Sequence, residues 1–169
     1  MTAETHNLGR HPAFHGKALL LSLALPLAVG ALSGFLTKSS MGIYSQIQLP
    51  RLAPPPLVFP FAWTILFLLM GLSAYRVLLA PDSGLVKKTP ALKLYLIQLA
   101  VNFVWPLLFF NLQSFLAAFL WLVLLWCLIL AMIYRFGRID TTAAWLQVPY
   151  LLWVFFAGYL NLGVYLLNR

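Results

Sequence analysis

Long apolar runs separated by short polar segments occupy most of the chain. Five of these runs are each about 20 residues long, which is the length of helix that crosses a hydrocarbon core roughly 30 Å thick. They cover residues 19–37, 57–79, 91–110, 115–134 and 143–167. Runs such as WLVLLWCLILAMIY lack the apolar–polar alternation of transmembrane barrel strands. The pattern therefore predicts an all-α membrane protein, a bundle of five transmembrane helices.

Amides and large aromatic rings recur inside the runs at the spacing of one helical face. Three faces carry them: Gln98, Asn102, Trp105 and Phe109 in the third run, Tyr150, Trp153, Ala157 and Asn161 in the fifth, and Phe59, Trp63, Phe67 and Met70 in the second. The amides either join helices by hydrogen bonds or contact a ligand, and for a single amide the joining role is favoured. Large rings around a small alanine favour a site for a flat apolar ligand, held by stacking and a few hydrogen bonds.

The polar segment between the first two runs, residues 38–56, is long and ends in RLAPPPLVFP. Consecutive prolines impose an extended conformation and prevent helix formation. Two interpretations follow from this stiffness. The segment is either a lid folded over the mouth of the bundle or a spacer that sets the entry angle of the second helix, and the sequence does not choose between them.

Composition supports a membrane protein and restricts its chemistry. Hydrophobic residues make up 63% of the chain, the mean hydropathy is +0.92, and the acidic residues are only Glu4, Asp82 and Asp140, all outside the apolar runs. A soluble domain would expose much of this apolar surface and aggregate. Proton relays, acid–base catalysis and metal binding in the membrane lack their usual residues. We therefore expect no catalytic residues and no metal site.

The net charge of +8 arises from cations that are unevenly distributed between the two ends of the predicted bundle. If five helices alternate, one end carries eight cations: Arg10, Lys17, Arg76, Lys87, Lys88, Lys93, Arg135 and Arg138. The other end carries three: Lys38, Arg51 and Arg169. Cytoplasmic loops carry such an excess, so we expect the N-terminus in the cytoplasm and the C-terminus outside. The cations form no patch interleaved with aromatic residues, so no nucleic acid is expected.

The chain divides into a polar tail and one membrane domain. Residues 1–17 form the tail, whose histidines have no cysteine or carboxylate cluster beside them: His6, His11 and His15. Residues 18–169 form a single five-helix domain. Within it, Gly30 and Gly34 form a small-xxx-small pattern that lets helices approach closely. That pattern leaves open whether the contact lies within one chain or in a homodimer.

Three stretches relate the chain to a known family. They are, in order, PRLAPPPLVFPFAWTILFLLMG, QLAVNFVWPLLFF and VPYLLWVFFAGYLN. With them the chain closely resembles the TspO/translocator protein family, also called the peripheral-type benzodiazepine receptors. The resemblance implies a five-helix bundle that binds porphyrins such as protoporphyrin IX and haem. For some members it also implies sterols and synthetic isoquinoline carboxamide or benzodiazepine-type ligands.

The resemblance also implies which residues bind the ligand. By motif position these are Tyr44, Pro54, Pro55, Phe59, Trp63, Asn102, Trp105, Tyr150, Trp153, Ala157, Leu160 and Asn161, and the helical pattern adds Phe109. Two tryptophans usual in the family are replaced, by Ile43 and Leu52. The second of these is implicated in the light-dependent breakdown of porphyrin by some bacterial members, so Leu52 argues against that activity here.

These observations lead to one functional hypothesis with two alternatives. The chain is expected to be a membrane tetrapyrrole-binding protein that acts as a sensor, scavenger or carrier and requires no cofactor. The alternatives are a light-dependent porphyrin-degrading enzyme and a transporter of sterols or other small lipophilic molecules. A bacterial inner membrane is the expected location, and a homodimer is one assembly that the small residues allow.

Overall fold

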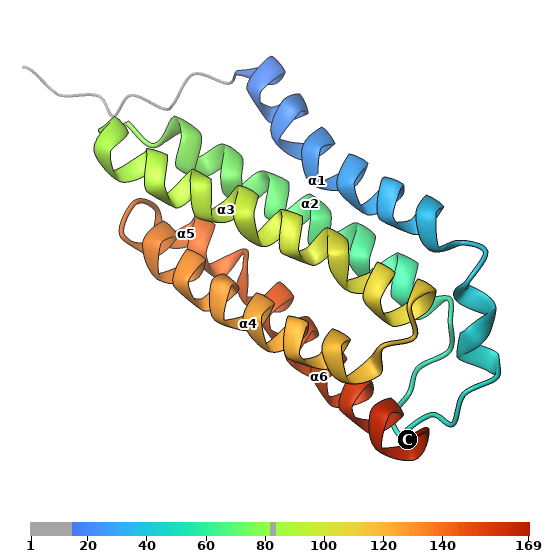
Figure 1. Ribbon diagram of the computed structural model, residues 1–169. Coiled ribbons are helices and arrows are strands. Elements are labelled where there is room, and N and C mark those ends of the chain that lie inside the picture. Colours follow the sequence, from blue (N-terminus) through green and yellow to red (C-terminus); the bar gives the residue numbers. More distant parts are fainter. Residues whose placement is uncertain (1–14, 82–83) are drawn as a thin grey trace, which may run out of the picture.

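The computed structural model describes residues 15–81 and 84–169, and it confirms the all-helical prediction (Figure 1). Within these residues, five helices are long and apolar enough to cross a membrane. The elements are α1 (Gly16–Thr37), the 3₁₀ turn η1 (Met41–Ser45), α2 (Val58–Leu79), α3 (Leu85–Pro106), the π turn η2 (Leu107–Asn111), α4 (Phe115–Gly137), α5 (Thr141–Trp145) and α6 (Val148–Leu167). The tail histidines His6 and His11 lie outside the described residues.

The helices extend beyond several of the predicted runs. Helix α3 begins at Leu85, six residues before the predicted start, and includes Pro90. Pro90 cannot donate to the Val86 carbonyl, yet the helix continues through it, which is why the proline did not mark the helix start. After Pro106 the backbone continues as the wider turn η2, since this second proline also lacks an N–H. The fifth span is divided in two by a break at Leu146 and Gln147, with α5 before it and α6 after it.

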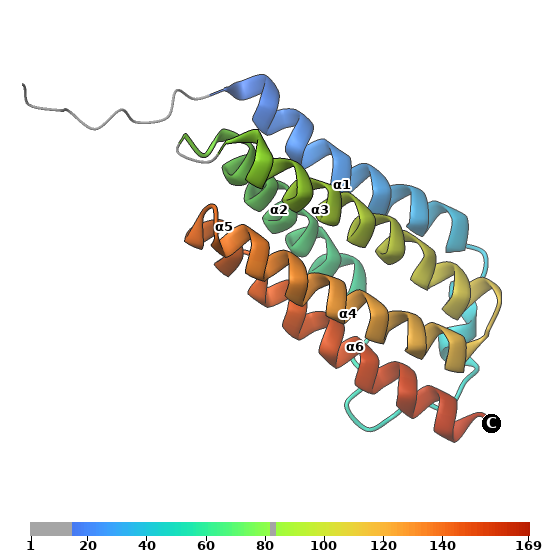
Figure 2. The ribbon, with the colours of Figure 1, turned by 60° about the vertical axis from the view of Figure 1, so that its left-hand side comes forward.

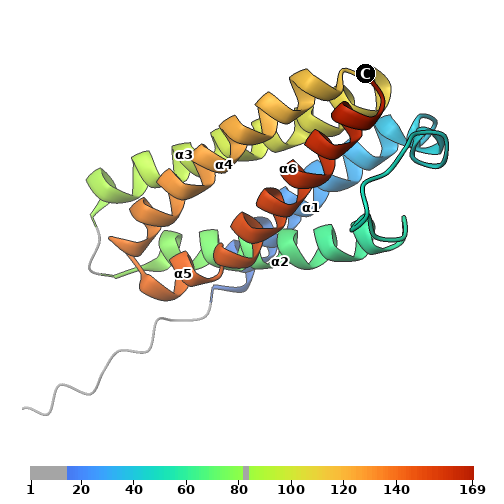
Figure 3. The ribbon, with the colours of Figure 1, turned by 90° about the horizontal axis from the view of Figure 1, so that it is seen from below.

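Each long helix of the bundle packs along at least two neighbours. Helix α4 packs along both α3 and α6, and α1 packs along α2 and α3. Figure 2 shows α1, α3, α4 and α6 in succession across the bundle, and in Figure 3 α6 runs between α4 and α2. Helix α5 and the start of α1 lie at one end, which we call the basic end. The segment 38–57 and the C-terminus lie at the other, the lid end (Figure 1).

An ion pair fastens α2 to α5 at the basic end. The Arg76 guanidinium donates to the Asp140 carboxylate, with an Nη2–Oδ2 distance of 2.8 Å. The same carboxylate caps α5 by accepting the Ala143 backbone N–H at 2.8 Å. Partial burial raises the pKa of Asp140, but the hydrogen bonds from Arg76 and Ala143 outweigh it and hold that pKa below its usual value. The carboxylate is therefore ionised and already paired.

Helices α1 and α2 approach most closely at Gly71. A Cβ atom at this position would lie 2.6 Å from the Ser22 carbonyl oxygen and 2.8 Å from the Leu23 Cα, both of them backbone atoms. A second close approach joins Gly30 of α1 to the Phe67 ring of α2. A Cβ atom at Gly34, the other glycine of the small-xxx-small pattern, would meet no atom of another helix within 4 Å among the described residues. The glycine pattern therefore serves packing within the chain at Gly30 but not at Gly34.

We predict that Gly71→Ala destabilises the bundle while Gly34→Ala does not. The alanine methyl at position 71 would meet backbone, which cannot move aside as a side chain does, and overpacking of this kind costs about 1–3 kcal/mol. Thermal unfolding of both variants in the same detergent checks this, with a lower Tm expected for Gly71→Ala only. Equal melting temperatures for the two variants would show that α1 and α2 do not approach as described.

Candidate functional site

A buried hydrogen-bonded bridge connects α3 to α6 through Tyr150. The Tyr150 hydroxyl donates to Gln98 Oε1 at 3.0 Å and accepts from Asn102 Nδ2 at 2.9 Å. The three side chains are almost fully excluded from solvent. The backbones of α3 and α6 scarcely approach each other, whereas both pack along α4. The bridge therefore spans the interior of the bundle and fixes the distance between these two helices.

A second bridge links three helices closer to the lid end. The Trp105 indole N–H donates to Asn161 Oδ1 at 3.1 Å, and Asn161 Nδ2 donates to the Phe115 carbonyl oxygen at 2.7 Å. Trp105 belongs to α3, Asn161 to α6 and Phe115 to α4. Each amide that the sequence placed on an inward face thus bonds to a protein group. Their observed role is to join helices.

A layer of aromatic rings fills the space between α2 and α6 next to the segment 38–57. Tyr44 lies edge-on to Phe59 with ring centroids 5.4 Å apart, and Phe59 lies edge-on to Trp153 at 6.1 Å. Trp63 meets Tyr150 at 6.1 Å, so the rings continue into the polar bridge. We call Tyr44, Phe59, Trp63 and Trp153 the aromatic layer. On the same helix as Trp153, Ala157 and Leu160 are buried.

Phe109 belongs to a different cluster of rings. Its ring lies 5.5 Å from that of Trp105 and 5.1 Å from that of Phe115, measured between centroids. This cluster closes the junction of α3, η2 and α4. Phe109 therefore contacts the second polar bridge, and none of its ring contacts among the described residues reaches the aromatic layer. The helical spacing that grouped Phe109 with the site does not reveal this difference.

The segment 38–57, from here on the lid, is fastened to the end of α6. The Gln48 N–H donates to Asn168 Oδ1 at 2.9 Å, and Asn168 Nδ2 donates back to the Gln48 carbonyl at 2.9 Å. The Pro50 ring packs against Gly163, where a Cβ would lie 2.8 Å from it. These contacts fold the segment across the bundle, which favours the lid over the spacer. Sequence reasoning missed this latch because Gln48 and Asn168 belong to no helical pattern.

The lid is also stiffened internally by Tyr44. The Tyr44 hydroxyl donates to the Pro54 carbonyl at 2.9 Å, across the turn that precedes α2. Partial burial raises the pKa of Tyr44 above its usual value, so the hydroxyl keeps its proton and remains a donor. Pro54 is half-buried, Pro55 is exposed, and Leu52 is 66% exposed. The replaced family tryptophan therefore corresponds to an aliphatic side chain on the outer side of the lid.

One buried donor in the aromatic layer has no hydrogen-bond partner among the described residues. The buried indole N–H of Trp153 bonds to nothing among the residues that the structure describes. Four further atoms share this condition: Tyr95 Oη, Trp126 Nε1 and both amide atoms of Gln147. An unpaired buried donor is costly in a membrane, where water is scarce. The Trp153 N–H is the one that lies among the rings under the lid, where a ligand acceptor would satisfy it.

Comparison with known proteins identifies the family. The model of the TspO/MBR family matches residues 22–167. Tryptophan-rich protein TspO of Chlorobaculum tepidum is 40% identical over 153 residues, covering 89% of this chain and 95% of that protein. The tryptophan-rich sensory protein of Cereibacter sphaeroides is 36% identical, covering 89% and 92%. The human translocator protein is 30% identical, covering 88% of each.

We predict that Tyr150→Phe destabilises the protein and that Tyr95→Phe does not. Loss of the Tyr150 hydroxyl takes away the partner of two buried amide atoms, Gln98 Oε1 and Asn102 Nδ2, at a cost of about 1–3 kcal/mol. The Tyr95 hydroxyl is equally buried but unpartnered, so its removal is neutral or stabilising. Thermal unfolding in detergent compares the two variants, each of which lacks one tyrosine hydroxyl. A bridge that mattered little would give both variants the wild-type Tm.

Proposed function

Since the chain belongs to the TspO/MBR family, we propose that it binds a tetrapyrrole, protoporphyrin IX or haem, and acts as a sensor, scavenger or carrier. The family includes proteins named tryptophan-rich sensory protein and translocator protein, so a role as a membrane sensor or translocator is shared at family level. The observation that carries the proposal for this chain is the aromatic layer beneath a latched lid.

The chemistry of the aromatic layer suits a flat, largely apolar macrocycle with a few acceptors. Phe59 and Trp153 offer ring faces for stacking, and such contacts contribute about 0.5–1.5 kcal/mol each beyond burial. The unpaired Trp153 N–H offers one hydrogen bond, for which a propionate oxygen of the porphyrin is a suitable acceptor. The buried Ala157 on the same helix adds little bulk beside these rings.

Binding at this site requires the lid to open. The ring of Phe59 contacts those of both Tyr44 and Trp153, so a macrocycle enters only when these rings separate. Tyr44 belongs to the lid, which is held nearby at Gln48 by its two hydrogen bonds with Asn168. Opening therefore breaks this latch. A more stable latch should therefore lower the affinity for the ligand.

The alternative of light-dependent porphyrin breakdown has less support. Leu52 is an exposed aliphatic side chain, and it cannot take part in the electron transfer that an indole ring supports. Trp153 alone would have to serve this reaction. We retain breakdown only as an outcome that the experiment below separates from binding.

The proposal is tested by protoporphyrin IX titration of the detergent-purified protein in the dark, followed by tryptophan quenching and porphyrin absorbance. Wild-type is compared with Trp153→Phe and with Trp126→Phe, which removes a different indole whose N–H is also unpartnered. We expect saturable binding, weakened about three- to tenfold in Trp153→Phe because one hydrogen bond and some ring area are lost. Trp126→Phe should bind as wild-type.

Each result has a definite meaning. Absence of saturable binding in the wild-type, or equal weakening in both variants, would overturn the proposed site. Loss of porphyrin absorbance on illumination in the wild-type, abolished in Trp153→Phe, would replace a binding role with degradation. Stable absorbance in light would leave sensing, scavenging or carriage.

The chain is a multi-pass membrane protein, and we propose that it lies in a bacterial inner membrane with its basic end in the cytoplasm. The structure gathers Arg76, Lys87, Lys88, Arg135 and Arg138 at one end of the bundle, which is the arrangement typical of a cytoplasmic face. Alkaline phosphatase fused after Arg169 should then be active, and green fluorescent protein fused at the same position should not fluoresce. An inactive phosphatase fusion together with a fluorescent green fluorescent protein fusion would show the opposite orientation.

A further inference from the structure

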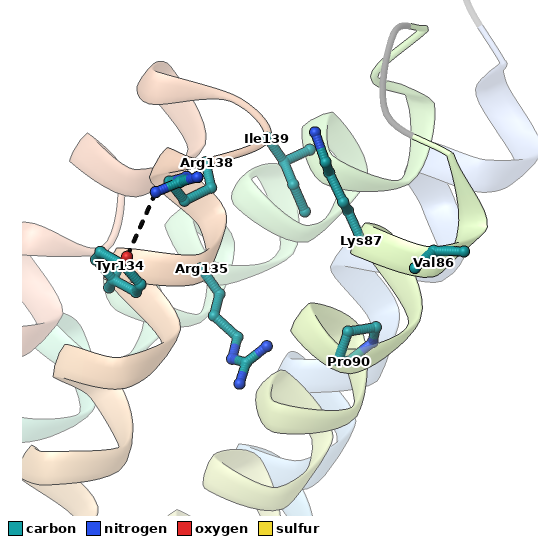
Figure 4. Close-up of a pocket in the computed structure, with 7 residues that line it drawn as sticks. All are labelled: Val86, Lys87, Pro90, Tyr134, Arg135, Arg138 and Ile139. Carbon is teal, nitrogen blue, oxygen red and sulfur yellow. Dashed lines mark hydrogen bonds between the residues drawn. The ribbon is translucent and has the colours of Figure 1, made fainter.

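A groove lies at the basic end, on the opposite side of the membrane from the aromatic layer. It has a volume of about 330 Å³ and separates the first turns of α3 from the last turns of α4 (Figure 4). Val86 and Pro90 line it from α3, and Ile139 lines it beyond the end of α4. These three side chains form an apolar floor, as expected for a surface close to hydrocarbon.

Three cations border the same groove. They are Lys87 of α3, Arg135 of α4 and Arg138 just after it. Figure 4 shows Arg135 directed into the gap between the two helices and Lys87 reaching up from α3 toward Ile139. Arg138 turns back toward Tyr134, to whose hydroxyl it donates at 3.5 Å. All three cations are exposed, so they remain available to a charged ligand.

No carboxylate neutralises these cations among the residues that the structure describes. The Arg76–Asp140 contact is the ion pair found there, and the Asp140 carboxylate is already shared by Arg76 and the Ala143 N–H. The chain's other acidic residues, Glu4 and Asp82, lie outside the described residues. Three like charges around one groove repel one another. An anion placed between them removes this repulsion and gains attraction to each.

The groove lies where the bundle leaves the membrane. Helix α4 carries exposed Tyr134 next to Arg135, and tyrosine and arginine are the residues that anchor helices at the headgroup level. Basic pockets between transmembrane helices on the cytoplasmic side bind anionic headgroups. A soluble phosphate would gain only the three charges. A phospholipid gains the charges and also covers the apolar floor formed by Val86, Pro90 and Ile139.

We propose that this groove binds the anionic phosphate headgroup of a phospholipid, such as phosphatidylglycerol or cardiolipin, with its glycerol and upper acyl carbons against the apolar floor. Arg135 and Lys87 hold the phosphate from opposite helices, and Arg138 completes the cationic rim. The site is independent of the proposed porphyrin site, because the two lie at opposite ends of the bundle and share no residue. A lipid held here would clamp α3 to α4 at the basic end.

The test uses the full chain in a neutral detergent and measures lipid binding by native mass spectrometry and by the shift in Tm. The probes are dioctanoyl phosphatidylglycerol, dioctanoyl phosphatidylcholine as the zwitterionic lipid, and glycerol phosphate as the soluble anion. Arg135→Gln with Arg138→Gln forms the groove variant. Lys38→Gln with Arg51→Gln is the matched control, since it removes the same charge from the lid end.

We expect saturable binding of phosphatidylglycerol, at least about tenfold tighter than that of phosphatidylcholine. The groove variant should lose at least about tenfold in affinity for phosphatidylglycerol, and the control variant less than about twofold. Arg135→Lys with Arg138→Lys keeps both charges and should retain most of the binding, which shows that the glutamine variant did not fail merely by misfolding.

Three outcomes would overturn the proposal. Equal affinity for the anionic and zwitterionic lipids would remove the role of the cations. Equal losses in the groove and control variants would show diffuse attraction by the net charge. Competition by glycerol phosphate at the concentration of the lipid would identify a site for soluble phosphates. None of these results bears on porphyrin binding, which is measured with a different ligand at the other end.

Discussion

The need to satisfy polar groups without water governs this bundle. Hydrocarbon offers no hydrogen bonds, so an amide inside the membrane must find a protein partner or remain unpaired at considerable cost. Tyr150 solves this for two amides at once, because its hydroxyl both donates to Gln98 and accepts from Asn102. The same bonds set the spacing of α3 and α6, whose backbones scarcely approach. The ring of Trp153 is carried by α6, one of the two helices that this bridge holds, and the ring of Trp63 on α2 packs against Tyr150 itself.

The two ends of the bundle differ in chemistry because they differ in amino-acid composition. At the lid end, prolines without N–H groups form a segment that cannot become helix and is instead latched to Asn168. At the basic end, arginines and lysines surround a groove with an apolar floor. Aromatic rings and one unpaired N–H favour a flat ligand with acceptors, whereas clustered cations favour a phosphate. The two proposed sites therefore select different molecules and operate on opposite faces of the membrane.

Hydrogen-bond partners separate the polar side chains that join helices from those still available to a ligand. Asn102, Asn161 and Gln98 were candidates for ligand contact, yet all three bond to protein groups. Trp153 was chosen for its ring, and its N–H is the buried polar group of the aromatic layer that has no partner among the described residues. A ligand that accepts this hydrogen bond gains more than it would from an amide already engaged. The amides thus form the frame of the candidate site, and the indole is the group free to interact.

The five helices and their inward faces could be predicted from the amino-acid pattern, because bilayer thickness sets the length of an apolar run and the helical period sets which residues share a face. That pattern grouped Gln98 with Asn102 and Trp105, and placed Tyr150 on a face with Asn161. It could not predict which of these side chains bond to each other, since partners on different helices depend on how the helices pack. The same holds for the start of α3 at Leu85, where tertiary context and the tolerance of Pro90 in an early turn extended the helix. The latch between Gln48 and Asn168 could not be predicted either, because these residues are far apart in the sequence. For the same reason the pattern did not reveal the groove that is lined by both Lys87 and Arg135.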